Sequence, residues 1–144
     1  MTIYADTGFL VKLYLLEPES AQAVAIIQKA KRAILLSYLS VLELRNAFLL
    51  NLFQKRISET TQRAAWKAFK TDLEDGIYAV LPLANAEHYD KAGELADRYT
   101  ASEGSRSLDL LHVAAALLFG AGELLSYDAR QRKLAVCEGL KVRP

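Results

Sequence analysis

The chain has 144 residues, of which 52% are hydrophobic and 24% are charged, a balance typical of globular proteins. Its length suits one domain spanning residues 1–144, and its composition excludes disordered and low-complexity scaffolds. Eighteen Lys and Arg residues against 17 Asp and Glu residues give a formal net charge of +1. Contact with nucleic acid must therefore come from a local cluster of charge, because the whole molecule is nearly neutral.

Nothing in the sequence indicates secretion or insertion into a membrane. The first residues, MTIYADTGF, lack the basic segment of a signal peptide. The longest uncharged apolar run, Val113 to Gly122, is well below the roughly 20 residues that a membrane span needs. Cys137 is the only cysteine, which excludes an internal disulfide and a cysteine-built metal site. We expect a cytoplasmic protein in a reducing compartment.

Short apolar runs alternate with helical segments along the chain. The first half predicts a strand at 2–5, a helix at 7–16, a second helix up to about Lys31, a strand at 33–37, a helix capped by Ser40 up to about Gln54, and a helix capped by Ser58 up to about Asp75. The second half predicts strands at 77–81, 123–126 and 140–143, and helices at 86–102, 107–119 (capped by Ser107) and 129–136. This alternation predicts a three-layer α/β/α fold with a mainly parallel sheet of four or five strands.

Four carboxylates stand where such a fold gathers ligands. Asp6 directly follows the first strand and Asp128 follows the fourth, so both lie at the carboxyl edge of the sheet, where α/β proteins bind ligands. Glu43 and Asp109 lie near the starts of two largely apolar helices, where a buried charge is costly unless it is paired or metal-bound. In isolation, Asp6 and Asp128 also suit helix N-caps, and Asp109 suits the first turn of its helix.

As a set, the four acids favour a metal site over four separate structural roles. Carboxylates near one edge would repel by roughly 3 kcal/mol per pair at about 5 Å, taking an effective dielectric constant near 20. A hard divalent cation relieves that repulsion, and magnesium prefers oxygen ligands. One or two such ions can activate water and neutralise charge on a phosphodiester.

The tripeptide Asp6-Thr7-Gly8 also matches the signature of aspartic proteases. Those enzymes need an all-β lobe, whereas Phe9 and Leu13 continue the sequence at helical spacing. A phosphatase of the haloacid dehalogenase type needs a second Asp two residues after the first, at the position of Gly8. Both alternatives are therefore disfavoured.

Four segments together resemble the four blocks of the PIN-domain family: YADTGFLVKLY, SVLELRNAF, RSLDLLHVAAAL and LLSYDARQRKLA. Within that family the chain is most similar to VapC-type toxins of prokaryotic toxin–antitoxin pairs. The resemblance implies that Asp6, Glu43, Asp109 and Asp128 form the acidic, metal-binding catalytic set of a Mg²⁺- or Mn²⁺-dependent ribonuclease. It further implies that Thr7 and Ser126 orient a carboxylate or water. Gly8 departs from the family pattern, because many relatives carry a larger side chain there.

Four further residues near the acids are candidates for contact with substrate: Asn46, Arg106, His112 and Arg130. Arg106 and Arg130 have the chemistry to hold an RNA backbone without reading its sequence. His112 shares a helix face with Asp109, but a lone histidine on an apolar helix is more often packed and hydrogen-bonded, and we favour that interpretation. Asn46 lies on the same helix face as Glu43, and a contact with substrate and a structural role are equally open for it. For Arg132 and Lys133 we expect ordinary surface pairing.

The sequence thus predicts a divalent-metal-dependent endoribonuclease, the toxin component of a VapBC-type pair. The implied partners are an RNA substrate, a small VapB-like antitoxin whose helix lies in an apolar groove leading to the acids, and a second copy of the chain. We expect the homodimer to use the helices around residues 42–53 and 86–99. One alternative is a catalytically inactive PIN-like module that binds RNA or protein, and another is a metal-dependent DNA nuclease.

Overall fold

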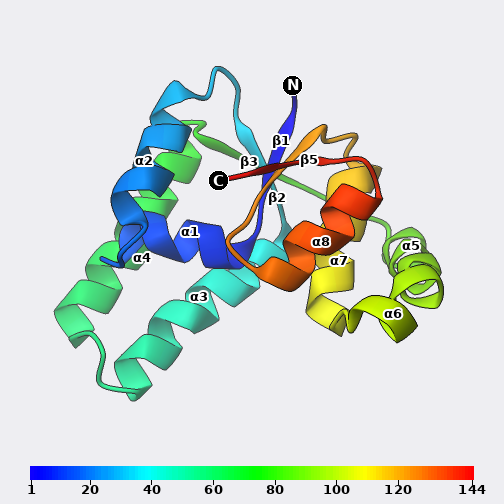
Figure 1. The fold of residues 1–144 in the computed structure, drawn as a ribbon. Coiled ribbons are helices and arrows are strands. Elements are labelled where there is room, and N and C mark those ends of the chain that lie inside the picture. Colours follow the sequence, from blue (N-terminus) through cyan, green and yellow to red (C-terminus); the bar gives the residue numbers. More distant parts are fainter.

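The computed structural model describes residues 1–144 and contains one five-stranded sheet. All neighbouring strands pair in parallel, in the order β3-β2-β1-β4-β5. Figure 1 shows the sheet at the centre with helices on either side. The strands are β1 (Ile3–Ala5), β2 (Ile34–Ser37), β3 (Tyr78–Leu81), β4 (Glu123–Leu125) and β5 (Lys141–Arg143). The predicted α/β fold with a parallel sheet is confirmed.

Eight α-helices and one π-helical turn connect the strands. They are α1 (Thr7–Tyr14), α2 (Ser20–Lys29), α3 (Tyr38–Phe53), α4 (Glu59–Glu74), α5 (Asn85–Leu95), the turn η1 (Ala96–Thr100), α6 (Ala101–Glu103), α7 (Ser107–Leu118) and α8 (Ala129–Cys137). Helices α1 to α4 pack on one face of the sheet, and α5, α7 and α8 pack on the other. None of these helices has the length and apolar character that crossing a membrane requires.

Two hydrophobic cores hold the three layers together, because successive strand residues point to opposite faces. On β1, Tyr4 enters the core beneath α5, α7 and α8, whereas Ala5 enters the core beneath α1 to α4. The neighbouring strand β4 divides Leu124 and Leu125 between the cores in the same way. All four residues are fully buried, which explains why the strands are continuous apolar runs.

The order of the strands determines where a ligand site is expected. From β1 the chain builds outward to β2 and β3, and then returns to place β4 on the other side of β1. The connections after β1 and β4 therefore leave in opposite directions and cover opposite faces. In parallel sheets, ligands bind outside the carboxyl ends of the strands at such a switch point. Asp6 and Asp128 both follow strands at that point.

Two predicted N-caps were wrong, while the bounds of the elements otherwise agree to within one or two residues. Helix α3 begins two residues before the predicted cap, because Ser37 is its N-cap and Ser40 forms the other half of a capping box. The N-cap of α7 is Arg106 and not Ser107, and its backbone N–H donates to the Asp109 carboxylate. The predicted helix at 86–102 is interrupted by η1, which widens the helical turn before Gly104.

Candidate active site at the carboxyl edge of the sheet

The four predicted acids line one open cavity of about 320 Å³ at the carboxyl edge of the sheet. Asp6 comes from the end of β1, Glu43 from α3, Asp109 from the start of α7, and Asp128 from the segment after β4. Only one residue of the lining is hydrophobic. The full lining is Asp6, Thr7, Gly8, Glu43, Arg106, Ser107, Leu108, Asp109, His112, Asp128 and Gln131. The fold therefore gathers carboxylates that are up to 122 residues apart in the sequence.

Asp6 is a buried carboxylate without a cationic partner. Its side chain is the N-cap of α1, where Oδ1 accepts the backbone N–H of Phe9 at 2.7 Å. Its other oxygen accepts the hydroxyl of Ser126. Only 1% of the residue is exposed, and this burial raises the pKa of Asp6 above its ordinary value, against the lowering effect of the two hydrogen bonds. Both hydrogen bonds to Asp6 thus come from neutral donors, no ion pair reaches it, and the charge of His112 lowers its pKa only from a distance.

Ser126 connects Asp6 to the fourth acid. Its hydroxyl oxygen accepts the backbone N–H of Asp128 at 3.1 Å while its proton is directed to Asp6. Asp128 is the N-cap of α8, where Oδ1 accepts the backbone N–H groups of Arg130 and Gln131 at 3.0 Å each. Its Oδ2 faces away from the helix, toward Arg106. Helix capping therefore fixes one oxygen of each of these acids, while the second oxygen contacts Ser126 in Asp6 and Arg106 in Asp128.

Arg106 forms ion pairs with two of the four acids, Asp109 and Asp128. Its Nε lies 3.1 Å from Asp109 Oδ2, and its Nη2 lies 3.0 Å from Asp128 Oδ2. Asp109 is buried, whereas 57% of the Arg106 side chain is exposed. The hydrogen bonds and charge of Asp109, together with the charge of Asp128, raise the pKa of Arg106. The predicted phosphate-binding arginine is therefore directed at carboxylates in this arrangement.

Glu43 is held by donors from two other helices. The Thr7 hydroxyl donates to Glu43 Oε1 at 3.0 Å, and Nε2 of His112 donates to the same oxygen. The other ring nitrogen, Nδ1, lies 2.7 Å from the hydroxyl of Tyr4. Burial alone would lower the pKa of His112, but the facing Tyr4 and Glu43 raise it to about 10. Both nitrogens of this buried ring have protein partners, so neither faces a substrate.

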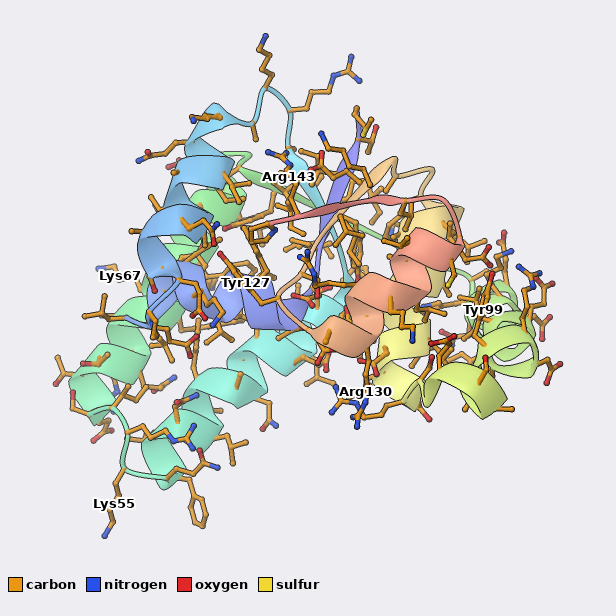
Figure 2. All side chains as sticks on the ribbon, in the orientation of Figure 1. Lys55, Lys67, Tyr99, Tyr127, Arg130 and Arg143 are labelled. Atoms are coloured by element: carbon orange, nitrogen blue, oxygen red, sulfur yellow. The ribbon has the colours of Figure 1, made fainter.

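The remaining predicted residues lie at or outside the rim of the cavity. Asn46 is exposed on α3, one turn beyond Glu43, and Arg130 is exposed at the start of α8. Figure 2 shows the Arg130 side chain extending away from the ribbon at that end of α8. Arg132 donates to the carbonyl of Ser126 at 2.8 Å, and Lys133 forms an ion pair with Glu103. The expectation of structural pairing for these last two residues is confirmed.

Sequence reasoning missed three residues that reach the acids through hydrogen bonds. Tyr4, Ser37 and Ser40 form a buried group behind His112. Their positions carried no local signal, because Tyr4 and Ser37 read as strand residues and Ser40 reads as a cap. At Gly8, an added Cβ would lie 3.7 Å from Asp6 Oδ1, which is ordinary van der Waals contact. The cavity therefore does not require glycine there on grounds of space.

The donor set fits a divalent cation, although the side chains are not gathered around one point. No three acidic, histidine or cysteine side chains lie close enough together to ligate a single ion in this arrangement. Two of the acids are turned to Arg106 instead, and the other two are turned to hydroxyl or imidazole donors. Carboxylate oxygens are nevertheless the ligands that magnesium and manganese take, and buried Asp6 still lacks a cation.

Comparisons with known proteins agree with this fold. A sequence model of the PIN domain matches residues 3–136. No curated protein matches the chain. Three solved structures share the fold over nearly the whole chain. VapC20 from Mycobacterium tuberculosis, described as a sarcin-ricin loop cleaving toxin, is 18% identical with a TM-score of 0.71, covering 99% of this chain and 100% of that chain.

The other two structures also share the fold over nearly the whole chain. FitAcB from Neisseria gonorrhoeae is 18% identical with a TM-score of 0.70, covering 99% of this chain and 97% of that chain. VapBC2 from Rickettsia felis, bound to a DNA fragment from the promoter, is 16% identical with a TM-score of 0.66, covering 99% and 98%. At these identities the similarity establishes the shared fold.

Proposed function

Because this chain belongs to the PIN-domain family, we propose that it is an endoribonuclease that depends on Mg²⁺ or Mn²⁺. One observation carries the proposal: four carboxylates line a single polar cavity, and one of the two fully buried ones, Asp6, has no ion-pair partner. A purely structural carboxylate at 1% exposure would be expected to have a paired charge. The unpaired state of Asp6 is better explained by a bound cation.

The four acids Asp6, Glu43, Asp109 and Asp128 would hold one or two ions. When bound, such ions activate water and neutralise charge on a phosphodiester. The chain's own residues prepare that chemistry by fixing the carboxylates. Ser126 orients Asp6, Thr7 orients Glu43, and helix capping orients Asp128. These contacts order the carboxylates before a ligand binds, so that less side-chain entropy is lost on binding.

Arg106 would change partners during this process. A cation at Asp109 and Asp128 competes with the guanidinium for the same oxygens. Because more than half of the Arg106 side chain is exposed, it can leave the two acids without a large rearrangement. Its released guanidinium, with Arg130 and Asn46 at the rim, would then meet the RNA backbone. Arginine suits this task because its planar donors match phosphate oxygens.

We further propose that the chain is the toxin of a VapBC-type pair and acts in the cytoplasm. The names of two structurally similar proteins support the first point, since VapC20 is described as a toxin and another structure is that of VapBC2. On this chain, support comes from apolar residues in the second half of α3 that lie exposed, namely Leu49, Leu50 and Phe53. An amphipathic antitoxin helix would cover such residues, in the helix-in-groove mode.

A homodimer is proposed at the other end of α3. Tyr38 and Tyr89, from α3 and α5, border the same hollow, and both are largely exposed with Leu42 nearby on α3. These residues fall within or beside the ranges 42–53 and 86–99 that the sequence suggested. A stable interface here should bury well over 1,000 Å² in total. Light scattering at micromolar concentration should show a dimer, and Leu42→Glu should convert it to a monomer.

A single-turnover cleavage assay tests the proposed activity. Single-stranded RNA should be cut in Mn²⁺ or Mg²⁺ and remain intact in EDTA, and restoring the metal should restore cleavage. An inactive RNA-binding module would retain RNA affinity in EDTA and cut nothing under either condition. Preferential cutting of single-stranded DNA in a competition experiment would favour the DNA nuclease. The Asp6→Asn variant is the negative control, because Asn preserves the cap of α1 and removes the charge.

A further inference from the structure

A buried chain of hydrogen bonds runs from the hydrophobic core to Glu43. The Tyr4 hydroxyl lies 3.1 Å from Ser37 Oγ, 3.0 Å from Ser40 Oγ and 2.7 Å from His112 Nδ1. The opposite nitrogen of the ring contacts Glu43 Oε1. Tyr4, Ser40 and His112 are each at most 1% exposed, so water does not compete for these contacts.

We propose that Tyr4 and His112 are positioning residues that present one oxygen of Glu43 to the metal site; the inference rests on the proposed function. An ionised carboxylate can only accept, so Nε2 of His112 must carry the proton that faces Glu43. The Thr7 hydroxyl donates to the same oxygen, Oε1. The structure shows no protein donor for Oε2, which is therefore the oxygen left to the cavity.

These residues come from the central strand and from both helical layers, so the core of the protein determines the orientation of Glu43. Tyr4 lies in the central strand β1, and His112 lies on α7 in the opposite helical layer from α3. Ser37 and Ser40 are the capping box of α3, the helix that carries Glu43. The same hydroxyl of Tyr4 thus contacts both the start of α3 and the ring that holds Glu43. A flexible glutamate is thereby fixed before a ligand arrives.

The hydroxyl of Tyr4 can be removed with little change in packing. Tyr4→Phe should weaken Mn²⁺ binding to the metal-free chain about tenfold and lower kcat for RNA cleavage about 10- to 100-fold, the range typical for groups that orient metal ligands. KM for RNA should stay unchanged, because Tyr4 does not reach the surface. Isothermal titration with Mn²⁺ alone and single-turnover kinetics measure the two effects.

Tyr78→Phe is the matched control. Tyr78 is a buried strand tyrosine like Tyr4, and its hydroxyl accepts from Tyr14 at 2.8 Å, far along the sheet from His112. Tyr14 keeps its second contact, to Asp72, when that hydroxyl is lost. Tyr78→Phe should therefore leave Mn²⁺ affinity and kcat at wild-type values. Equal effects of the two substitutions would overturn the proposal.

Variants of the histidine separate positioning from packing. His112→Gln keeps an amide donor for Glu43 and should retain more Mn²⁺ affinity than His112→Ala, although both remove the ring. His88 provides the control, because it is also buried and its Nε2 contacts only the carbonyl of Leu111 at 2.7 Å. His88→Ala should lower stability without changing Mn²⁺ affinity. If the Gln and Ala variants of His112 bind Mn²⁺ equally weakly, only packing matters and the proposal fails.

A spectroscopic measurement keeps this inference separate from the proposed activity. In metal-free protein, the Nε2–H resonance of His112 should be protected from exchange, shift in Glu43→Gln, and lose protection in Tyr4→Phe. Wild-type protein that neither binds Mn²⁺ nor cuts RNA would refute the proposed nuclease. If neither substitution changes the chemical shift or the exchange protection of this resonance, the positioning role is refuted, whether or not the chain is a nuclease.

Discussion

Two buried carboxylates at opposite edges of the same sheet have very different surroundings. Glu123 begins β4 at the amino edge and is 3% exposed, and Asp6 follows β1 at the carboxyl edge and is 1% exposed. Glu123 forms an ion pair with Arg143 of the neighbouring strand β5. Asp6 has a serine hydroxyl and a backbone N–H, and burial raises its pKa. The first charge is compensated within the chain, whereas the second is not.

This difference indicates function better than the size of a cavity does. The amino edge has the larger cavity, about 420 Å³, lined by Glu123, Arg143 and three basic residues at the end of α2 and in the loop after it (Lys29, Lys31 and Arg32). Its single carboxylate, Glu123, already pairs with Arg143, so this cavity has no free carboxylate to bind a cation. The smaller cavity at the carboxyl edge contains four acids against Arg106 and His112, and neither of these forms an ion pair with Asp6. Uncompensated buried charge is costly, and proteins retain it chiefly where a ligand uses it.

The largest expected effect comes from removing the uncompensated charge. Asp6→Asn should lower the single-turnover cleavage rate by roughly a thousandfold or more, because it removes a charge at the centre of the proposed site. The same substitution should raise the free energy of unfolding at neutral pH by about 1 kcal/mol, as is common where active-site repulsion is relieved. Urea titration at pH 7 measures the gain. A loss of stability would mean that Asp6 is structural, like Glu123.

The pH dependence of that gain has a definite sign. The pKa of Asp6 is raised above its ordinary value of 3.8 in the folded chain. The folded state therefore binds the proton more tightly than the unfolded state, and wild-type stability falls as pH rises from about 3.8 through the folded pKa. The stability of the Asp6→Asn variant does not fall in this way, because Asn does not titrate. The stability difference between variant and wild type should be small near pH 4 and grow toward neutral pH.

The converse substitution at the amino edge should affect stability alone. Glu123→Gln leaves the Arg143 guanidinium without its carboxylate, in a place where 37% of that side chain is exposed. Partial exposure reduces the penalty below that of a fully buried pair, and we expect a loss of about 1–2 kcal/mol in the free energy of unfolding. Cleavage rates per folded molecule should be unchanged. A large loss of cleavage would show that the two edges are coupled.

Sequence patterns predicted the sheet, the two helical layers and the four acids, because these depend on periodicity and on residues that directly follow strands. They could not predict the partners of His112, since Tyr4 is 108 residues away and Glu43 is 69 residues away. Ser40 and Ser107 were expected as N-caps from local sequence alone. Instead, Ser40 of α3 contacts Tyr4. At the start of α7, the Asp109 carboxylate accepts the backbone N–H of Arg106. Local propensity therefore predicts elements better than it predicts which polar groups meet.

Arg106 offers a smaller effect that separates metal binding from RNA binding. Arg106→Gln removes the cation that now occupies Asp109 and Asp128, so Mn²⁺ affinity should increase about fivefold, a range consistent with exposed ion pairs. RNA affinity should decrease, since the proposed phosphate contact is lost. Calorimetry with Mn²⁺, and fluorescence anisotropy with a non-cleavable RNA analogue in saturating Mn²⁺, measure the two changes. Weaker Mn²⁺ binding in this variant would mean that Arg106 organises the acids and does not compete with the metal.

The smallest expected effect compares two exposed arginines, one at each edge of the sheet. Arg130 lies beside the acidic cavity and Arg32 beside the larger cavity at the amino edge, and neither forms an ion pair in the structure. Each substitution by Gln removes one positive charge, so long-range attraction for RNA falls equally. A side chain that neutralises a phosphate also releases the counterions bound there. For single-stranded RNA, each such contact contributes about 0.7 to the slope of log affinity against log salt concentration. Arg130→Gln should therefore weaken RNA binding about twofold to threefold and reduce that slope, whereas Arg32→Gln should leave the slope unchanged. Equal slopes for both variants would place the RNA path outside the carboxyl edge, and would separate the acidic cavity from substrate binding.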